Sequence, residues 1–97
     1  MKKIKVLENE YEIIIDNQLS FNLADVEKII TEYFEPYDYI LGDYSYGKLR
    51  LKGFYDNMNK MVNSINNFND VDNYIKCFCA YNCKYFILKK IKNDKLS

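Results

Sequence analysis

The stretch Gly42-Asp-Tyr-Ser-Tyr-Gly-Lys-Leu-Arg-Leu-Lys-Gly53 contains all three glycines of the 97-residue chain and its only arginine, Arg50. Strand-forming residues on both sides of Gly47 predict a β-hairpin, because glycine readily takes the left-handed conformation that a tight turn requires. The glycines at the two ends of the stretch are small enough to let another backbone or a ligand come close. The stretch therefore predicts both a local fold and a candidate site.

The second arm of this hairpin alternates cationic and apolar residues. Side chains of a strand point in turn to its two faces. We therefore expect Lys48, Arg50 and Lys52 to share one face, and we call these three side chains the cation row. Leu49 and Leu51 then point to the opposite face and belong to the core.

The rest of the chain reads as short strands and two amphipathic helices. The first helix follows Asn22, a good N-cap residue, and continues to Pro36, whose ring disfavours helical conformation in the residue before it. The second helix follows Asn69 or Asp70, and a final strand covers residues 84–91. The other expected strands cover residues 4–7, 11–16, 37–43 and 48–55.

Hairpins combined with separate helices predict an α+β fold. We expect a mostly antiparallel sheet of four to five strands, with both helices packed on one face and the other face partly exposed to solvent. The length allows one domain, residues 1–97, and the proportion of hydrophobic residues, 48%, is enough for a modest core.

The composition excludes several classes of protein. The chain has no histidine, which removes histidine-based catalysis and histidine metal sites. No apolar run approaches the roughly 20 residues that a membrane helix needs, and the N-terminal residues do not form a signal peptide. We therefore expect a cytoplasmic protein. Charges balance overall but not along the chain, since ten of the 14 acidic residues precede residue 48 and ten of the 14 basic residues follow residue 47.

Two segments resemble the YutD-like family, small proteins of Gram-positive bacteria. The first is Tyr37-Asp-Tyr-Ile-Leu-Gly-Asp-Tyr-Ser-Tyr-Gly-Lys-Leu-Arg-Leu-Lys-Gly-Phe-Tyr55, and the second is Tyr74-Ile-Lys-Cys-Phe-Cys-Ala-Tyr-Asn-Cys-Lys-Tyr-Phe-Ile-Leu88. Tyr44, Lys48 and Asn82 differ from the family pattern, which has tryptophan, glutamine and glycine there. The resemblance implies an α+β fold and a cytoplasmic setting, and it implies no known activity.

The hairpin supports two interpretations. In the first it binds an anion, the phosphate backbone of RNA or of the ribosome, because tyrosine rings stack on bases while cations meet phosphates. In the second Arg50 is structural and holds Asp43 or Asp38 across the hairpin. The candidate binding residues are those at and beside the turn: Asp43, Tyr44, Tyr46, Lys48, Arg50 and Lys52.

Other chemistries have less support. Cys77, Cys79 and Cys83 are weak candidates for a metal site, because zinc usually takes four ligands and the chain offers only these three cysteines. No spacing indicates a cofactor or a catalytic pair, so we expect a binding module rather than an enzyme. The alternative to RNA is a protein-interaction adaptor that meets an acidic partner or a second copy of the chain.

Overall fold

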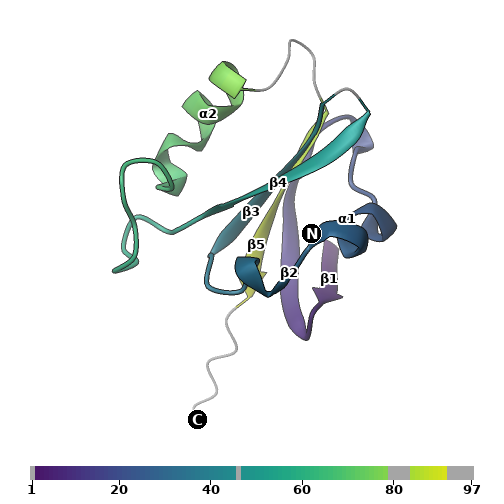
Figure 1. Cartoon of the computed structure of the whole chain (residues 1–97), viewed down its shortest axis with the longest axis horizontal. Helices are drawn as coiled ribbons and strands as arrows, with labels where there is room; N and C mark the ends of the chain where they lie inside the picture. Colours follow the sequence, from purple (N-terminus) through teal and green to yellow (C-terminus); the bar gives the residue numbers. More distant parts are fainter. Residues whose placement is uncertain (1, 46, 79–83, 92–97) are drawn as a thin grey trace.

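The computed structural model describes residues 2–45, 47–78 and 84–91. Within these residues five strands form one sheet in the order β1-β2-β5-β3-β4, and each neighbouring pair is antiparallel (Figure 1). The strands are β1 (Lys2–Val6), β2 (Asn9–Asp16), β3 (Tyr39–Ser45), β4 (Lys48–Phe54) and β5 (Tyr85–Ile91). The α+β class and the antiparallel sheet are therefore confirmed.

The first helix, α1 (Leu23–Ile29), is shorter than predicted. Asn22 is its N-cap as expected, and its side chain accepts a hydrogen bond from the backbone N–H of Asp25 at 3.1 Å. The helix does not continue to Pro36, because Ile30 is extended and the Thr31 side chain accepts the N–H of Tyr33 at 3.3 Å. This cap begins a separate turn of 3₁₀ helix, η2 (Glu32–Phe34).

The prediction that both helices pack on one face is wrong. In α1, Val26 belongs to a buried cluster with Phe86 and Leu88 of β5. In α2 (Val71–Phe78), Val71 belongs to a second cluster with Ile87, which points to the other side of the same strand. The helices therefore lie on opposite faces of the sheet (Figure 1). The physical reason is that β5 is a central strand and is buried on both faces.

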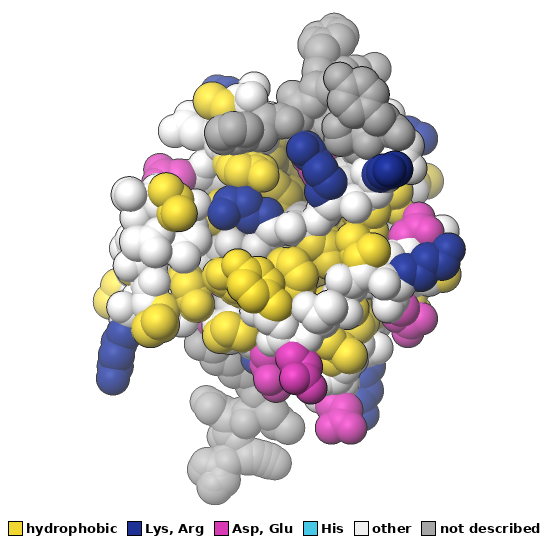
Figure 2. All heavy atoms as spheres, in the orientation of Figure 1, with side chains coloured by type: hydrophobic (Ala, Val, Ile, Leu, Met, Phe, Trp, Pro, Cys, Tyr) yellow, Lys and Arg dark blue, Asp and Glu magenta, His cyan; other side chains and the backbone are white. Residues whose placement is uncertain are grey.

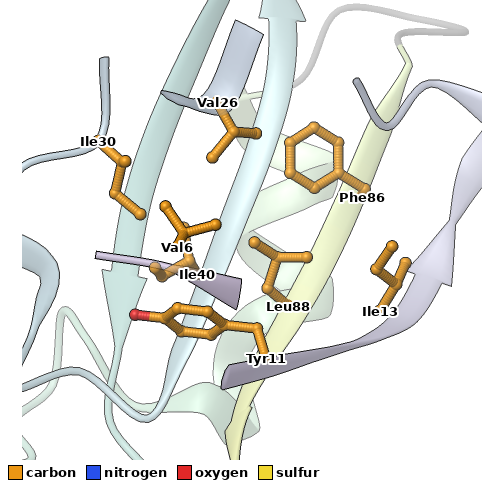
Figure 3. Close-up of a cluster of buried hydrophobic side chains, with 8 residues drawn as sticks. All are labelled: Val6, Tyr11, Ile13, Val26, Ile30, Ile40, Phe86 and Leu88. Carbon is orange, nitrogen blue, oxygen red and sulfur yellow. The ribbon is translucent and has the colours of Figure 1, made fainter. Parts of the chain in front are cut away.

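The larger cluster lies between α1 and the sheet and draws side chains from β1, β2, β3 and β5 (Figure 3). Its members are Val6, Tyr11, Ile13, Val26, Ile30, Ile40, Phe86 and Leu88. The smaller cluster, beneath α2, consists of Leu41, Phe54, Val71 and Ile87. The β3–β4 hairpin lies between the two clusters. On β3, Ile40 belongs to the larger cluster and Leu41 to the smaller; on β4, partly buried leucines pack against the larger cluster and Phe54 belongs to the smaller.

The β3–β4 hairpin has the turn that its sequence predicts. Ser45 pairs with Lys48, and Gly47 has a φ of 80°, in the left-handed region.

No helix among the described residues is both long and apolar enough to cross a membrane.

Candidate functional site

Arg50 is bound to Asp43 on the neighbouring strand. The two residues stand directly opposite each other in the β3–β4 register. Arg50 donates from Nε to Oδ1 at 3.1 Å and from Nη2 to Oδ2 at 2.7 Å. The side chain of Asp43 is only 6% exposed, whereas that of Arg50 is 49% exposed. The hydrogen bonds and the negative charge of Asp43 raise the pKa of Arg50. The structural interpretation of this arginine is therefore the one that the geometry favours.

The two lysines of the cation row differ in their surroundings. The Nζ atom of Lys52 lies 5.1 Å from the centre of the Phe54 ring and 5.6 Å from that of Tyr74, which belongs to α2. Both distances are within the range of a cation–π interaction. Lys48, next to the turn, is exposed. The register places the whole row on the α2 face, so the prediction that these side chains share one face is confirmed.

Tyr44 lies on the opposite face from the cation row. It packs against the cluster beneath α1, and its hydroxyl donates to Oδ2 of Asp25 at 2.8 Å. Burial, followed by this hydrogen bond and the charge of Asp25, raises the pKa of Tyr44 to about 12. The structure therefore does not bring Tyr44 beside the cations, and the site expected from the sequence is divided between two faces. Tyr46, the other turn tyrosine, is outside the described residues.

The glycines at the two ends of the hairpin are covered by rings of this chain. A Cβ atom at Gly42 would lie 2.2 Å from the ring of Phe86, and one at Gly53 would lie 2.3 Å from the ring of Tyr37. These close approaches explain why both positions are glycine. We expected another backbone or a ligand to approach these glycines. The close neighbour at each position is instead an aromatic side chain of the same chain.

An aromatic group beside Gly53 was missed in the sequence, where Tyr33 and Phe34 read as part of the first helix. The hydroxyl groups of Tyr33 and Tyr37 are hydrogen-bonded at 3.1 Å, and the ring of Phe34 lies edge-on to that of Tyr33 at 5.0 Å. This hydrogen bond, followed by burial, raises the pKa of Tyr37 to about 12. Tyr33 is nevertheless 66% exposed. The only sequence signal is the density of aromatic residues around Pro36.

A hollow of about 280 Å³ follows β4. Figure 2 shows this side of the molecule, where Lys and Arg side chains lie above a band of hydrophobic side chains. The lining residues come from both sides of the strand: Tyr33, Phe34, Tyr37, Leu51 and Gly53 on the α1 side, and Leu41, Asp43, Arg50, Lys52 and Tyr74 on the α2 side. The hollow therefore has an apolar, aromatic side and a charged side.

The outer edge of β4 carries backbone groups that point away from the sheet. Successive residues of an antiparallel strand direct N–H and C=O alternately to its two sides. The N–H of Tyr44 donates to the carbonyl of Lys84 and so points toward β5. The backbone N–H and C=O of Asp43 therefore point toward β4, and those of its partner Arg50 point toward β3. The residues of β4 whose backbone groups point outward are then Leu49, Leu51 and Gly53. Gly53 is buried beside the Tyr37 ring, so the accessible outward positions are Leu49 and Leu51, which are partly exposed. Among the described residues no strand pairs with them, and we call this backbone, with the hollow beside it, the β4 edge.

Comparison with known proteins identifies the family. The family described as "Putative antitoxin YutD-like" matches residues 5–89 of the chain. A protein of Bacillus subtilis (strain 168) named "Putative antitoxin YutD" is 36% identical over 83 residues, which cover 86% of this chain and 91% of that protein. The chain belongs to the YutD-like family. The resemblance of the two sequence segments to this family is thereby confirmed.

A solved structure supports the fold of this YutD-like chain. The solution NMR structure of protein YutD from B. subtilis matches it with a TM-score of 0.78 and 34% identity, covering 100% of this chain and 86% of that one. The description of the family names an antitoxin and no reaction.

Of the three cysteines named as weak metal candidates, one belongs to the described residues of this YutD-like chain. Cys77 is exposed on α2, while Cys79 and Cys83 lie outside the described residues. In the part of the chain that is described, no three cysteine, aspartate or glutamate side chains come together as a metal site.

Proposed function

We propose that this YutD-like chain is a cytoplasmic protein-binding module that takes up a strand of another protein along the β4 edge. One observation carries the proposal: the partly exposed residues Leu49 and Leu51 direct backbone donors and acceptors outward, beside the hollow along β4. An extended segment that pairs with such an edge gains main-chain hydrogen bonds, and the neighbouring side chains select its sequence.

The family name is consistent with this proposal. A protein named as an antitoxin is one that counteracts a toxin, and a surface for another protein would serve that purpose. The β4 edge is suited to such contact because it is bordered by the exposed ring of Tyr33 and by the cation row.

The geometry gives less support to RNA or ribosome association, which stays a prediction. That hypothesis places tyrosine rings and cations on one surface. Here Tyr44 lies on the α1 face, and Arg50 holds Asp43 with two hydrogen bonds. Lys48 and Lys52 are the members of the cation row that would remain for phosphates.

The proposal is tested by affinity capture from a lysate of the source organism, with and without ribonuclease. The informative pair of variants is Leu51→Pro and Leu51→Ala. Both lose the same leucine side chain, but only proline removes the outward N–H. Circular dichroism and a thermal melt establish that both variants fold.

We expect a defined protein that survives ribonuclease and is retained by the wild type and by Leu51→Ala, but is lost from Leu51→Pro. Equal retention by both variants would show that the partner uses another surface and would overturn the proposal. Loss of all captured material after ribonuclease would favour the RNA hypothesis instead.

A further inference from the structure

We infer that the strand added at the β4 edge carries acidic residues at positions i and i+4, apolar residues at i+1 and i+3, and a polar residue at i+2. This inference rests on the proposed function and names the chemistry of the partner. The expected pattern is acidic, apolar, polar, apolar, acidic.

The pattern follows from the two faces of β4. Side chains directly opposite each other on adjacent strands have Cβ atoms about 5 Å apart, so each residue of an added strand meets the β4 residue on the same face. On the α2 face it meets the cation row. On the α1 face it meets Leu49, Leu51 and the Tyr37 ring that covers Gly53. Alternation of charged and apolar residues in β4 therefore selects the same alternation in its partner.

The spacing of the acids follows from the charges already balanced within the fold. Asp43 binds Arg50 from the β3 side, so the middle cation of the row already has an opposite charge beside it. The excess positive charge lies at Lys48 and Lys52, four residues apart. Four strand residues span about 13 Å, which sets the distance between the two acids of the partner.

The same charges disfavour a second copy of the chain as the occupant. A two-fold antiparallel pairing of two β4 strands around Leu51 would place Arg50 of one copy directly opposite Lys52 of the other. Like charges directly opposite each other destabilise a strand pair, and lysines on an edge strand act against pairing of identical edges. The row therefore selects an acidic partner and opposes self-association.

The inference is tested by selecting random nine-residue peptides, displayed on phage, against the full chain. We expect enrichment of peptides with Asp or Glu at positions i and i+4 and apolar residues at i+1 and i+3. A selected peptide should bind Leu51→Pro at least tenfold more weakly than Leu51→Ala, because both variants lose the leucine contact but only proline removes the N–H. The same peptide should also lose at least tenfold in affinity for the double variant Lys48→Glu/Lys52→Glu. A copy of the peptide with lysine in place of both acids should show the reverse preference and bind this double variant better than the wild type.

The outcomes separate this inference from the proposed function. Peptides that depend on the N–H of Leu51 but show no paired acids would overturn the inference and leave strand addition standing. Peptides that bind Leu51→Pro as well as Leu51→Ala would overturn both. Absence of any enriched sequence would contradict the inference, and so would a dimer in analytical ultracentrifugation that Leu51→Pro dissociates. A fold check by circular dichroism accompanies each variant, and Lys48→Gln/Lys52→Gln replaces the charge reversal if the latter does not fold.

Discussion

Arg50 and Asp43 stand opposite each other on β4 and β3 and are joined by two hydrogen bonds, of 3.1 and 2.7 Å, on the face that α2 covers. The carboxylate is almost fully buried, while the guanidinium is half exposed. Such a pair is asymmetric, because the arginine can be solvated alone and the aspartate cannot. The pair explains why a chain whose other 13 basic residues are lysine has an arginine here, since only the guanidinium fork makes two parallel hydrogen bonds to one carboxylate.

Removing this arginine should destabilise the fold. We expect Arg50→Ala to lower the free energy of unfolding by about 2 kcal/mol, because the buried Asp43 carboxylate loses both hydrogen bonds. Lys48→Ala, at an exposed position of the same strand, should change it by less than about 0.5 kcal/mol. Urea unfolding of the two variants measures the contrast. Equal effects would show that the pair is energetically unimportant.

A double variant tests whether the loss of stability in Arg50→Ala comes from the charge of the buried Asp43 carboxylate. Asp43→Asn combined with Arg50→Ala should be more stable than Arg50→Ala alone, because asparagine carries no charge that must be desolvated. A double variant at least as unstable as the single one would contradict this account. Arg50→Ala is consequently a poor probe of binding, since it perturbs the hairpin that presents the β4 edge.

Tyr44 should give the stability of the protein a dependence on alkaline pH. Its folded-state pKa is about 12, above the ordinary value of about 10. The protonated hydroxyl therefore stabilises the fold fully below about pH 10, and this contribution is lost as the pH rises toward 12. We expect Tyr44→Phe to be less stable than the wild type by about 1 kcal/mol at pH 7, with the difference shrinking above pH 10. Urea unfolding at pH 7, 9 and 11 tests this; a constant difference would contradict it.

The three glycines of the hairpin should respond differently to alanine. Gly42→Ala should cost the most, about 2 to 3 kcal/mol, because the new methyl group would overlap the fully buried ring of Phe86. Gly53→Ala should cost less, because the ring of Tyr37 is only half-buried and can move. Gly47→Ala meets no atom within 4 Å, so its cost, about 1 kcal/mol, comes from the positive φ alone.

Thermal unfolding of the three alanine variants checks this order, and Gly47→Asn is the matched control. Asparagine tolerates the left-handed region better than alanine, so Gly47→Asn should be more stable than Gly47→Ala. No such gain is expected at Gly42 or Gly53, where the obstacle is a ring. An equal loss at all three positions would mean that backbone freedom, and not ring contact, accounts for the glycines.

Much of the hairpin could be predicted from the sequence, because its determinants are local. The turn at Gly47 and the shared face of the cation row follow from glycine conformation and strand alternation. Alternation also implies that Asp43 and Tyr44, as neighbours in a strand, point to opposite faces. Grouping both with the cations overlooked this consequence, and the structure separates them.

The arrangement of the layers could not be predicted as readily, because it depends on contacts between distant segments. The insertion of β5 between β2 and β3 is invisible to local patterns. The continuous apolar run Phe86-Ile87-Leu88 does indicate a strand buried on both faces, and therefore a helix on each face. The early end of α1 lies at the extended residue Ile30, and the Thr31 hydroxyl that follows caps a new turn. The aromatic group of Tyr33 and Tyr37 at the β4 edge follows from that break.

The central claim, that β4 has an open edge ready for a partner strand, is tested most directly by amide hydrogen exchange followed by NMR. In the isolated chain we expect fast exchange at Leu49 and Leu51 and slow exchange at Arg50 and Lys52, because only the backbone N–H groups of the latter two point into the sheet. Addition of a selected peptide should slow exchange at Leu49 and Leu51 and leave the other two unchanged. Slow exchange at Leu49 and Leu51 in the isolated chain, or no change at these residues when the peptide binds, would contradict the claim.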